Sequence, residues 1–289
     1  MALDNDFQSE KNTNVLRVSI VCYSANETQL KNTLKTLMAS GVVILSEKLI
    51  DRIDIFLVDN GPAGIEREKI KSIFNSLLGL APPEIKLHRI GNGQNVGFGV
   101  GHNQAIDPEA SDFHLILNPH VELNADSLSE ALGFMREHAE CGLLSPAITD
   151  GFDKVQYPCK RYPSVMDLAL RGFAPGWLRD VFLSRLASYE MRDSMNERVL
   201  WQPPIISGCF ILLRAGLLKK ISGFDPAFFL YFEDFDLSLR AAKVSKIAYV
   251  PSVKIIHHGG NAAKKGWRHI FLFVRSAVQF FNKHGWKFF

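Results

Sequence analysis

The chain has 289 residues, of which 47% are hydrophobic and 22% are charged, a composition that excludes an intrinsically disordered protein. Its four cysteines are far apart and form no CxxC pair, which argues against a disulfide scaffold and a structural zinc site. The first 20 residues are polar, and no run of about 18 apolar residues occurs, so we expect neither a secretory signal nor a membrane span. These features predict a cytoplasmic protein.

The formal net charge is +3, but the basic residues are concentrated near the C-terminal end. Residues 237–289 contain ten Lys or Arg and no Asp or Glu, whereas residues 1–236 contain 23 basic and 30 acidic residues. A basic end on an acidic chain favours a polyanionic partner, which could be nucleic acid, a phospholipid surface or a phosphorylated substrate. The alternative is an ordinary solvated surface.

Strand-like and helix-like segments alternate through the first half of the chain. Runs rich in β-branched residues predict strands at 15–23, 53–59, 85–90 and 113–117. Apolar residues at helical spacing predict helices at 27–38, 66–78 and 126–138. This order predicts βαβ units and a largely parallel sheet.

Such sheets bind ligands just beyond the carboxyl ends of their strands. Tyr23, Asp59 and Asn60, and the triplet Asn118-Pro119-His120 follow three of the predicted strands. They are therefore candidate ligand contacts.

The regular alternation stops at residues 149–202, which are rich in proline, aromatic residues and arginine. We expect irregular structure there, with one or two helices that cover a site. Strand-like runs return at 205–213 and 247–256.

A cluster of carboxylates, Glu233, Asp234 and Asp236, lies within the strongly apolar stretch FDPAFFLYFEDFD. Crowded carboxylates in an apolar setting raise one another's pKa, which suits a general base that works near neutral pH. The alternative is that Glu233 or Asp234 caps a helix over 235–243.

Two further motifs are weaker signals when taken alone. The glycine-rich run 95–103 (NVGFGVGHN) permits close backbone approach to a ligand, although it lacks both the GxGxxG and the Walker spacing. An ordinary turn explains it equally well. The His257-His258 pair lies beyond a predicted strand and suits a divalent ion, a phosphate or simple packing.

Taken in order, these motifs resemble the family 2 glycosyltransferases, in particular the bacterial rhamnosyltransferase-like branch that builds cell-surface polysaccharides such as O-antigen. The motifs that carry the resemblance are VSIVCY, VDNG, NVGFGVGHN, LNP, SGCFILLR, GFDPAFFLYFEDFDLSLR and HHGG, and they span residues from about Val15 to about Phe281. The resemblance implies an α/β GT-A fold, with a Rossmann-like, mostly parallel sheet and helices on both faces, continuous with an acceptor-binding part.

The resemblance also implies a division of the chain. We expect a flexible extension at 1–14, a nucleotide-sugar-binding part at 15–148, an acceptor-binding and catalytic part at 149–266, and a basic amphipathic helix at 267–289.

The activity that the resemblance implies is transfer of a sugar, first L-rhamnose, from a nucleotide-diphosphate donor to a saccharide or lipid-linked saccharide, with inversion. Asp234 matches the base that deprotonates the acceptor hydroxyl, with Glu233 beside it. The acceptor side would include Gly208, Phe232 and Asp236. The nucleotide site would be lined by Tyr23, Asp59, Asn60, Asn95, Gly97, Asn103 and Asn118.

The sequence departs from the family pattern at His120, where the family usually has the Asp of Asn-Pro-Asp that holds Mg²⁺ or Mn²⁺. Three interpretations stay open. His120 and His257 hold the divalent cation, or the two histidines meet the diphosphate without a metal, or the chain is a non-catalytic relative that binds the nucleotide sugar. No nucleic-acid-reading motif is present, so we expect no nucleic acid partner.

The C-terminal segment places Ile270, Phe271, Val274, Val278 and Phe281 on one helical face. The same segment carries the basic residues Arg268, Arg275 and Lys283. It either packs on the domain or makes a peripheral contact with the inner face of an anionic cytoplasmic membrane.

Overall fold

The computed structural model describes residues 14–24, 26–62, 64–91, 93–259 and 266–289. The expected flexible extension at 1–14 lies, apart from Asn14, outside the described residues.

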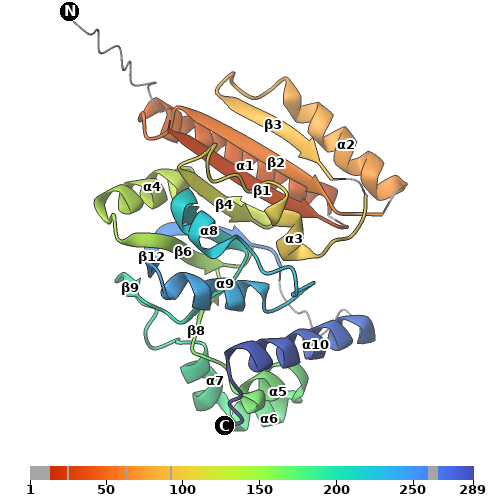
Figure 1. Ribbon diagram of the computed structural model, residues 1–289, viewed down its shortest axis with the longest axis vertical. Helices are drawn as coiled ribbons and strands as arrows, with labels where there is room; N and C mark the ends of the chain where they lie inside the picture. The colour runs from red at the N-terminus through yellow and green to blue at the C-terminus, as the bar shows by residue number, and fades with distance from the viewer. Residues whose placement is uncertain (1–13, 25, 63, 92, 260–265) are drawn as a thin grey trace, which may run out of the picture.

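A mixed sheet with the strand order β3-β2-β1-β4-β11-β6-β12-β5 forms the centre of the molecule (Figure 1). Its first four strands are parallel, β11 is antiparallel to both of its neighbours, and β12 runs parallel to β6 and antiparallel to β5. These strands are β1 (Val15–Cys22), β2 (Arg52–Asp59), β3 (Ile85–Ile90), β4 (Phe113–Leu117), β5 (Val121–Leu123), β6 (Cys141–Thr149), β11 (Phe210–Arg214) and β12 (Lys246–His257). Because strands from both halves of the chain join one sheet, the two halves share a core.

Helices cover both faces of this sheet (Figure 1). The first face carries α1 (Glu27–Ser46), α2 (Ile65–Leu78) and α4 (Ser127–Glu137), whose buried residues form the largest apolar cluster with β1 and β2. The second face carries α3 (Phe98–Asn103), α8 (Ala215–Ile221) and α9 (Glu233–Ala242). The glycine-rich run therefore becomes a helix from Phe98 onward.

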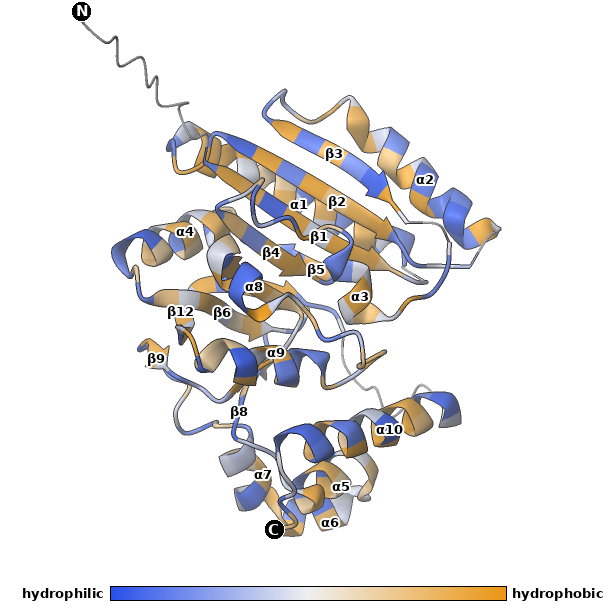
Figure 2. Cartoon of the chain, viewed as in Figure 1, coloured by the Kyte–Doolittle hydropathy of each residue, from blue (hydrophilic) through white to orange (hydrophobic). Residues whose placement is uncertain are grey.

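Burial follows the apolar pattern of each strand. Every residue of β4 is buried, whereas the edge strand β3 alternates apolar and polar residues, as Figure 2 shows. An edge strand with solvated polar positions is a common protection against edge-to-edge pairing.

Residues 149–202 contain more regular structure than expected, namely three helices and short strands. Ser164 and Asp167 form a capping box that starts the first of these helices. The elements are β7 (Val155–Gln156), β8 (Cys159–Lys160), α5 (Val165–Phe173), α6 (Gly176–Val181), α7 (Leu183–Tyr189) and β9 (Leu200–Trp201). β8 pairs with β10 (Ile205–Ile206) in a separate two-stranded ribbon.

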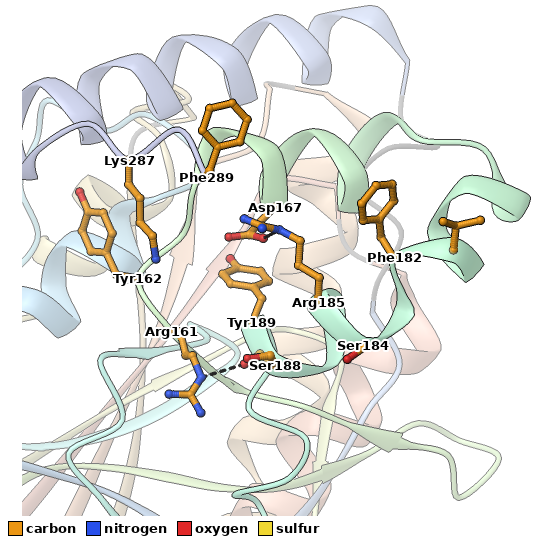
Figure 3. A pocket seen from close by; sticks show the side chains of 11 residues that line it. Arg161, Tyr162, Asp167, Phe182, Ser184, Arg185, Ser188, Tyr189, Lys287 and Phe289 are labelled. Atoms are coloured by element: carbon orange, nitrogen blue, oxygen red, sulfur yellow. Dashed lines mark hydrogen bonds and ion pairs between the residues drawn. The ribbon is translucent and has the colours of Figure 1, made fainter.

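The C-terminal helix α10 (Trp267–His284) packs across α5 and α9 through Phe280 and Phe281. The chain then crosses the start of α5, where the Val165 amide donates to the Lys287 carbonyl at 2.8 Å. Together α5, α7 and residues 287–289 surround a cavity of about 600 Å³ (Figure 3). No helix in the described part of the chain combines the length and the apolar character needed to cross a membrane.

Two histidines, His102 of α3 and His114 of β4, are buried on either side of Ser19 of β1. The Ser19 hydroxyl lies 2.7 Å from His102 Nδ1 and 2.8 Å from His114 Nε2. Burial lowers the pKa of both rings, to about 3 for His114. Both imidazoles are therefore neutral in the folded protein at neutral pH.

This pair predicts that acid destabilises the fold. Below about pH 6.5 the unfolded chain binds protons at these histidines while the folded chain does not, so the free energy of unfolding falls by about 1.4 kcal/mol per pH unit for each ring. The variant His114→Gln keeps a partner for Ser19 and removes one titrating group. Urea denaturation at pH 8 to 4 should show a slope reduced by about that amount below pH 6.5. Equal slopes for variant and wild type across this range would contradict the assignment.

Candidate functional site

Asp59 lies at the carboxyl end of β2, is buried, and is held by two arginines. Its Oδ2 lies 3.3 Å from Arg67 Nε and 3.4 Å from Arg89 Nη1, while the Gly61 amide donates to Oδ1 at 3.3 Å. Tyr23, which follows the neighbouring strand β1, is half exposed. This edge therefore combines a fixed carboxylate with an accessible aromatic ring. Neither arginine was identified from the sequence.

Asn60 joins the end of β2 to the glycine-rich loop. Its Nδ2 donates to the Gly97 carbonyl at 3.0 Å and to Asn95 Oδ1 at 3.2 Å, and its Oδ1 accepts from the Val96 amide at 3.0 Å. Gly97 has a φ of +91°, and a Cβ at this position would lie 2.3 Å from the Phe229 carbonyl oxygen. The loop therefore requires glycine here on two counts, conformation and space.

Asn103, the last residue of α3, binds the backbone of Phe224. Its Nδ2 donates to the Phe224 carbonyl at 2.8 Å, and its Oδ1 accepts from the Phe224 amide at 2.9 Å. The side chain thus holds the segment that leads into the carboxylate cluster.

Asp234 is oriented by backbone amides. Its Oδ2 accepts from the Gly208 amide at 2.8 Å, and its Oδ1 accepts from the Phe235 amide at 3.0 Å. Next to Gly208, the Cys209 carbonyl accepts from the Asn118 amide at 2.9 Å. This chain of contacts connects Asp234 to the end of β4.

Asn118 Oδ1 is buried and has no hydrogen-bond partner within the described residues, so an acceptor oxygen is left for a ligand.

Glu233 and Asp234 differ in their surroundings although they are adjacent. Glu233 is buried, and its Oε2 makes no hydrogen bond to any described residue. Burial first, and then the charge of Asp234, raise the pKa of Glu233 well above its usual range. Burial also raises the pKa of Asp234, but two backbone amides and Lys160 oppose this effect. Asp234 is therefore the carboxyl group of the pair that ionises more readily, and Glu233 holds its proton more strongly.

Helix α9 begins at Glu233, directly after two residues in the left-handed conformation. Tyr231 and Phe232 have φ values of +70° and +66°. Phe232 occupies the N-cap position, and no side chain caps the helix. Glu233 and Asp234 are therefore not the N-cap but the first two residues of the helix, where their position suits the helix dipole. Left-handed backbone at bulky residues is strained, and such strain is concentrated at functional sites.

Lys160 is a charged residue of this site that the sequence did not reveal. Its side chain is buried on β8, and its Nζ donates to the Tyr157 carbonyl at 2.9 Å. Burial lowers the pKa of Lys160 to about 8. The β8–β10 ribbon, which continues to Gly208, places this cation near Asp234.

Two residues expected on the acceptor side lie inside the protein instead. Phe232 is buried in an aromatic cluster with Phe235, Phe273 and Phe280. The expectation was wrong because the left-handed turn directs this ring inward, toward α10. Gly208, in contrast, is only partly buried and bonds Asp234, so its acceptor-side role stays a prediction.

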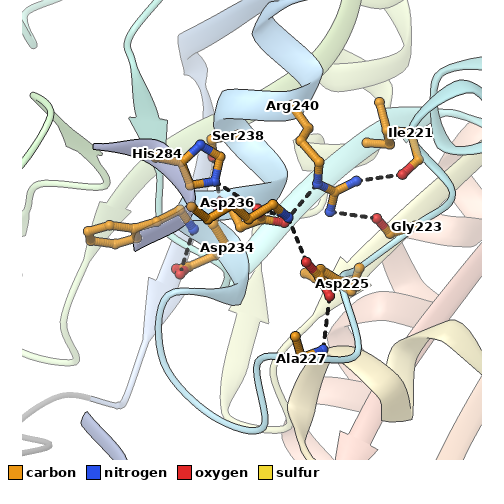
Figure 4. A network of polar contacts seen from close by, with 12 residues as sticks. Ile221, Gly223, Asp225, Ala227, Asp234, Asp236, Ser238, Arg240 and His284 are labelled. Atoms are coloured by element: carbon orange, nitrogen blue, oxygen red, sulfur yellow. Dashed lines mark hydrogen bonds and ion pairs between the residues drawn. The ribbon is translucent and has the colours of Figure 1, made fainter. Parts of the chain in front are cut away.

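Asp236 is likewise not available to an acceptor, because it has no exposed surface and is surrounded by basic side chains (Figure 4). Its carboxylate lies 2.7 Å from Arg240 Nε, 2.6 Å from Lys283 Nζ and 2.8 Å from His284 Nε2. Lys283 and His284 belong to α10. Asp236 therefore anchors the C-terminal helix to α9, and its acceptor-side prediction is wrong.

His120 and His257 lie side by side because β5 and β12 pair with His257 opposite Val121. Their rings stack with centroids 4.9 Å apart. Gln156 Nε2 donates to the His257 carbonyl at 2.9 Å, which turns Gln156 Oε1 toward His257 Nδ1, also at 2.9 Å. A Cβ on Gly259 would lie 2.2 Å from His120 Nε2 and 2.7 Å from His257 Nε2, so both nitrogens face the same backbone segment.

The ligands at this position do not fit Mg²⁺ or Mn²⁺ well. Both ions prefer oxygen ligands, and the pair offers imidazole nitrogens. Nearby Glu122 is hydrogen-bonded to His258 and to Asn32, each at 3.0 Å. Within the described ranges, no three His, Cys, Asp or Glu side chains are grouped so that they could hold a metal ion.

Comparison with known proteins identifies sugar transferases, although no family model matches the chain. The chain is 26% identical to N-acetylglucosaminyl-diphospho-decaprenol L-rhamnosyltransferase of Mycobacterium tuberculosis over 189 residues, which is 61% of this chain and 59% of that protein. It is 24% identical to rhamnosyltransferase WbbL of Escherichia coli K12 over 174 residues, or 56% of this chain and 61% of WbbL. The chain thus matches less than two thirds of the length of these curated relatives.

Solved structures share the fold. GalNAc-T7 with UDP, GalNAc and Mn²⁺ superposes with a TM-score of 0.55 at 13% identity, covering 86% of this chain and 44% of that one. Staphylococcus aureus TarS in complex with UDP superposes with a TM-score of 0.53 at 15% identity, covering 92% of this chain and 65% of TarS. The expected GT-A fold is confirmed.

The buried cation predicts a measurable effect on Asp234. Lys160→Met removes a charge that favours the ionised carboxylate, so the pKa of Asp234 should rise. Carboxyl ¹³C NMR titration in a Glu233→Gln background measures this pKa without the neighbouring acid. Lys243→Met, at an exposed position following α9, is the control and should leave the titration unchanged. An unaltered titration in the Lys160 variant would show that its charge does not act on Asp234.

Proposed function

We propose that this chain is a glycosyltransferase in which Asp234 is the general base. The observation that carries the proposal is the Asp234 carboxylate, oriented by the Gly208 and Phe235 amides beside a neutral Glu233. In the reaction, Asp234 takes the proton of an acceptor hydroxyl. The resulting oxygen attacks the anomeric carbon as the nucleoside diphosphate leaves, so the sugar is transferred with inversion.

The donor site in this proposal lies at the carboxyl ends of β1 and β2. Tyr23 supplies an exposed ring for the nucleobase. Asp59 is the proposed partner of the nucleoside at the same edge, where its carboxylate is buried against Arg67 and Arg89. Asn60, Asn95 and Gly97 form the loop that shapes the far wall of this site. The Asn118 acceptor oxygen lies between the donor side and Asp234. Because the similar curated proteins are rhamnosyltransferases, L-rhamnose is the first donor sugar to test.

The His120–His257 pair is the proposed contact for the leaving diphosphate. Developing charge on a leaving group needs positive charge or hydrogen-bond donors that are already in position. Two adjacent imidazoles supply such contacts without a carboxylate ligand set. Because Gln156 Oε1 accepts at His257 Nδ1, His257 donates from Nε2 only in its doubly protonated form. A divalent cation is present in the similar GalNAc-T7 structure, so its contribution here has to be measured.

Helix α10 presents the proposed contact with an anionic membrane. Phe280 and Phe281 are buried against the domain, whereas Trp267, Phe271 and Val274 are exposed. The expected apolar face is therefore divided, since Phe281 packs inside while the rest of that face is open to solvent. Arg268 and Arg275 accompany these exposed residues, and aromatic side chains beside basic residues suit the surface of an anionic bilayer.

Substitutions of Asp234 and of its neighbour Glu233 give the principal test of this function. Asp234→Asn should lower kcat by about 10²-fold or more, because the amide cannot accept the proton. Glu233→Gln replaces a neutral acid by a neutral amide of the same shape and should keep most of the turnover. Both are compared in a transfer assay from dTDP-L-rhamnose to N-acetylglucosaminyl diphosphofarnesol. Equal turnover of wild type and Asp234→Asn would remove Asp234 as the base, and nucleotide binding without any transfer would favour the non-catalytic alternative.

The histidine pair predicts how activity responds to chelation. Since the ligands do not suit Mg²⁺ or Mn²⁺, wild-type transfer should persist in EDTA. His120→Asp introduces a carboxylate near the diphosphate, so this variant should lose activity in EDTA and regain it with Mn²⁺. Wild-type activity that EDTA abolishes and Mn²⁺ restores would instead support the metal-bound arrangement.

A further inference from the structure

The cavity between α5, α7 and the C-terminal segment is separate from the site described above (Figure 3). The chain after α10 is held on the start of α5, because the Val165 and Met166 amides donate to the carbonyls of Lys287 and Phe288. Lys287 and Phe289 both line the cavity, as residues two apart in an extended segment point to the same side. The cavity wall is therefore assembled from parts of the chain more than 100 residues apart.

The lining carries an excess of positive charge. Arg161, Arg185 and Lys287 contribute three cationic side chains, whereas Asp167 has the single acidic side chain among the lining residues. Asp167 is already neutralised by Arg185, whose Nε lies 2.6 Å from Oδ1. Arg161 is held in position by a 3.0 Å bond from its Nε to the Ser188 carbonyl. Two cations are thus left to act on a ligand, which must be anionic.

Tyr189 adds an unsatisfied polar group to the wall. Its side chain is 3% exposed and lines the cavity, yet its hydroxyl makes no hydrogen bond within the described chain. Buried polar groups in native proteins are nearly always hydrogen-bonded. The phenol therefore offers a donor to an anion that enters the cavity.

The cavity also has an apolar side. Val181 and Phe289 line it and are 72% and 82% exposed. Trp177 and Leu183, which flank it on α6 and α7, are also exposed. An anionic head group bound to the arginines would thus leave its substituents on an apolar surface.

The backbone connects this cavity directly to the proposed base. Arg161 follows Lys160 on the β8–β10 ribbon, which leads to Gly208 and Asp234. The Arg161 amide in turn donates to the Tyr189 carbonyl at 2.9 Å. This ribbon therefore carries residues of the cavity wall and residues that surround Asp234 on one continuous stretch of backbone.

From these observations we infer that the cavity binds the diphosphate of a lipid-linked acceptor, with the lipid on the apolar rim. This inference rests on the proposed function, since it assigns the part of the acceptor that lies beyond the reacting sugar.

The test uses the full chain and farnesyl diphosphate, a lipid diphosphate that lacks a sugar, in a calorimetric titration. The double variant Arg161→Ala with Lys287→Ala should weaken binding about tenfold or more, because it removes charge-assisted contacts to the diphosphate. Tyr189→Phe keeps the ring packed and should weaken binding by a smaller factor. Arg179→Ala, an exposed cation of α6 outside the cavity, is the control and should bind as the wild type does.

Three results would overturn the inference: equal affinity in the double variant, inorganic pyrophosphate binding as tightly as farnesyl diphosphate, or displacement by phosphatidylglycerol vesicles. The last would make the cavity a site for ordinary phospholipid headgroups.

The transfer assay separates this inference from the proposed function. A double variant with normal kcat and a raised KM for N-acetylglucosaminyl diphosphofarnesol supports both. An unchanged KM removes the inference alone, and cavity-dependent binding without any transfer removes the function alone.

Discussion

The arrangement of the site depends on a carboxylate that takes no part in the proposed chemistry. Asp236 is fully buried, and Arg240, Lys283 and His284 surround it. Arg240 in turn binds the Ile221 and Gly223 carbonyls, and Lys283 also reaches Asp225 at 2.5 Å. Removing one partner from such a buried cluster costs about 3–5 kcal/mol. The cluster fixes α9, α10 and the loop before α9 as one unit, and this unit carries Asp234.

Glu233, Asp234 and Asp236 lie within four positions of the sequence, but their neighbours shift their pKa values differently. Burial would raise the pKa of Asp236, but hydrogen bonds from Lys283, His284 and Arg240 outweigh burial and lower it. Glu233 receives no such bond, and its pKa rises well above the usual range. Asp234 lies between these two cases, because backbone amides and Lys160 partly compensate its burial. The proposed base is therefore poorly solvated, yet its charged form is partly stabilised by its neighbours.

Local patterns predicted the nucleotide-side half of the fold well, because periodicity and breakers act over short distances. The strands expected at 85–90 and 113–117 coincide with β3 and β4. The run at 205–213 was expected as one strand, but it is interrupted between β10 and β11, where the Gly208 amide turns to Asp234. Asp234 and Asp236 look equivalent in the sequence. Their difference comes from α10, 48 residues away in the case of His284, and from Lys160 on β8, and no local pattern records such contacts.

The glycine-rich loop and the segment before α9 are hydrogen-bonded to each other and closely packed. The Phe98 amide donates to the Phe229 carbonyl at 2.9 Å, Gly97 leaves no room for a side chain against the same carbonyl, and Asn103 holds both polar groups of the Phe224 backbone. The halves on either side of residue 148 are therefore not interchangeable modules. A chimaera with a homologue would have to take residues 97–103 and 223–229 from the same parent. A substitution on one side of this contact therefore has to be matched on the other side.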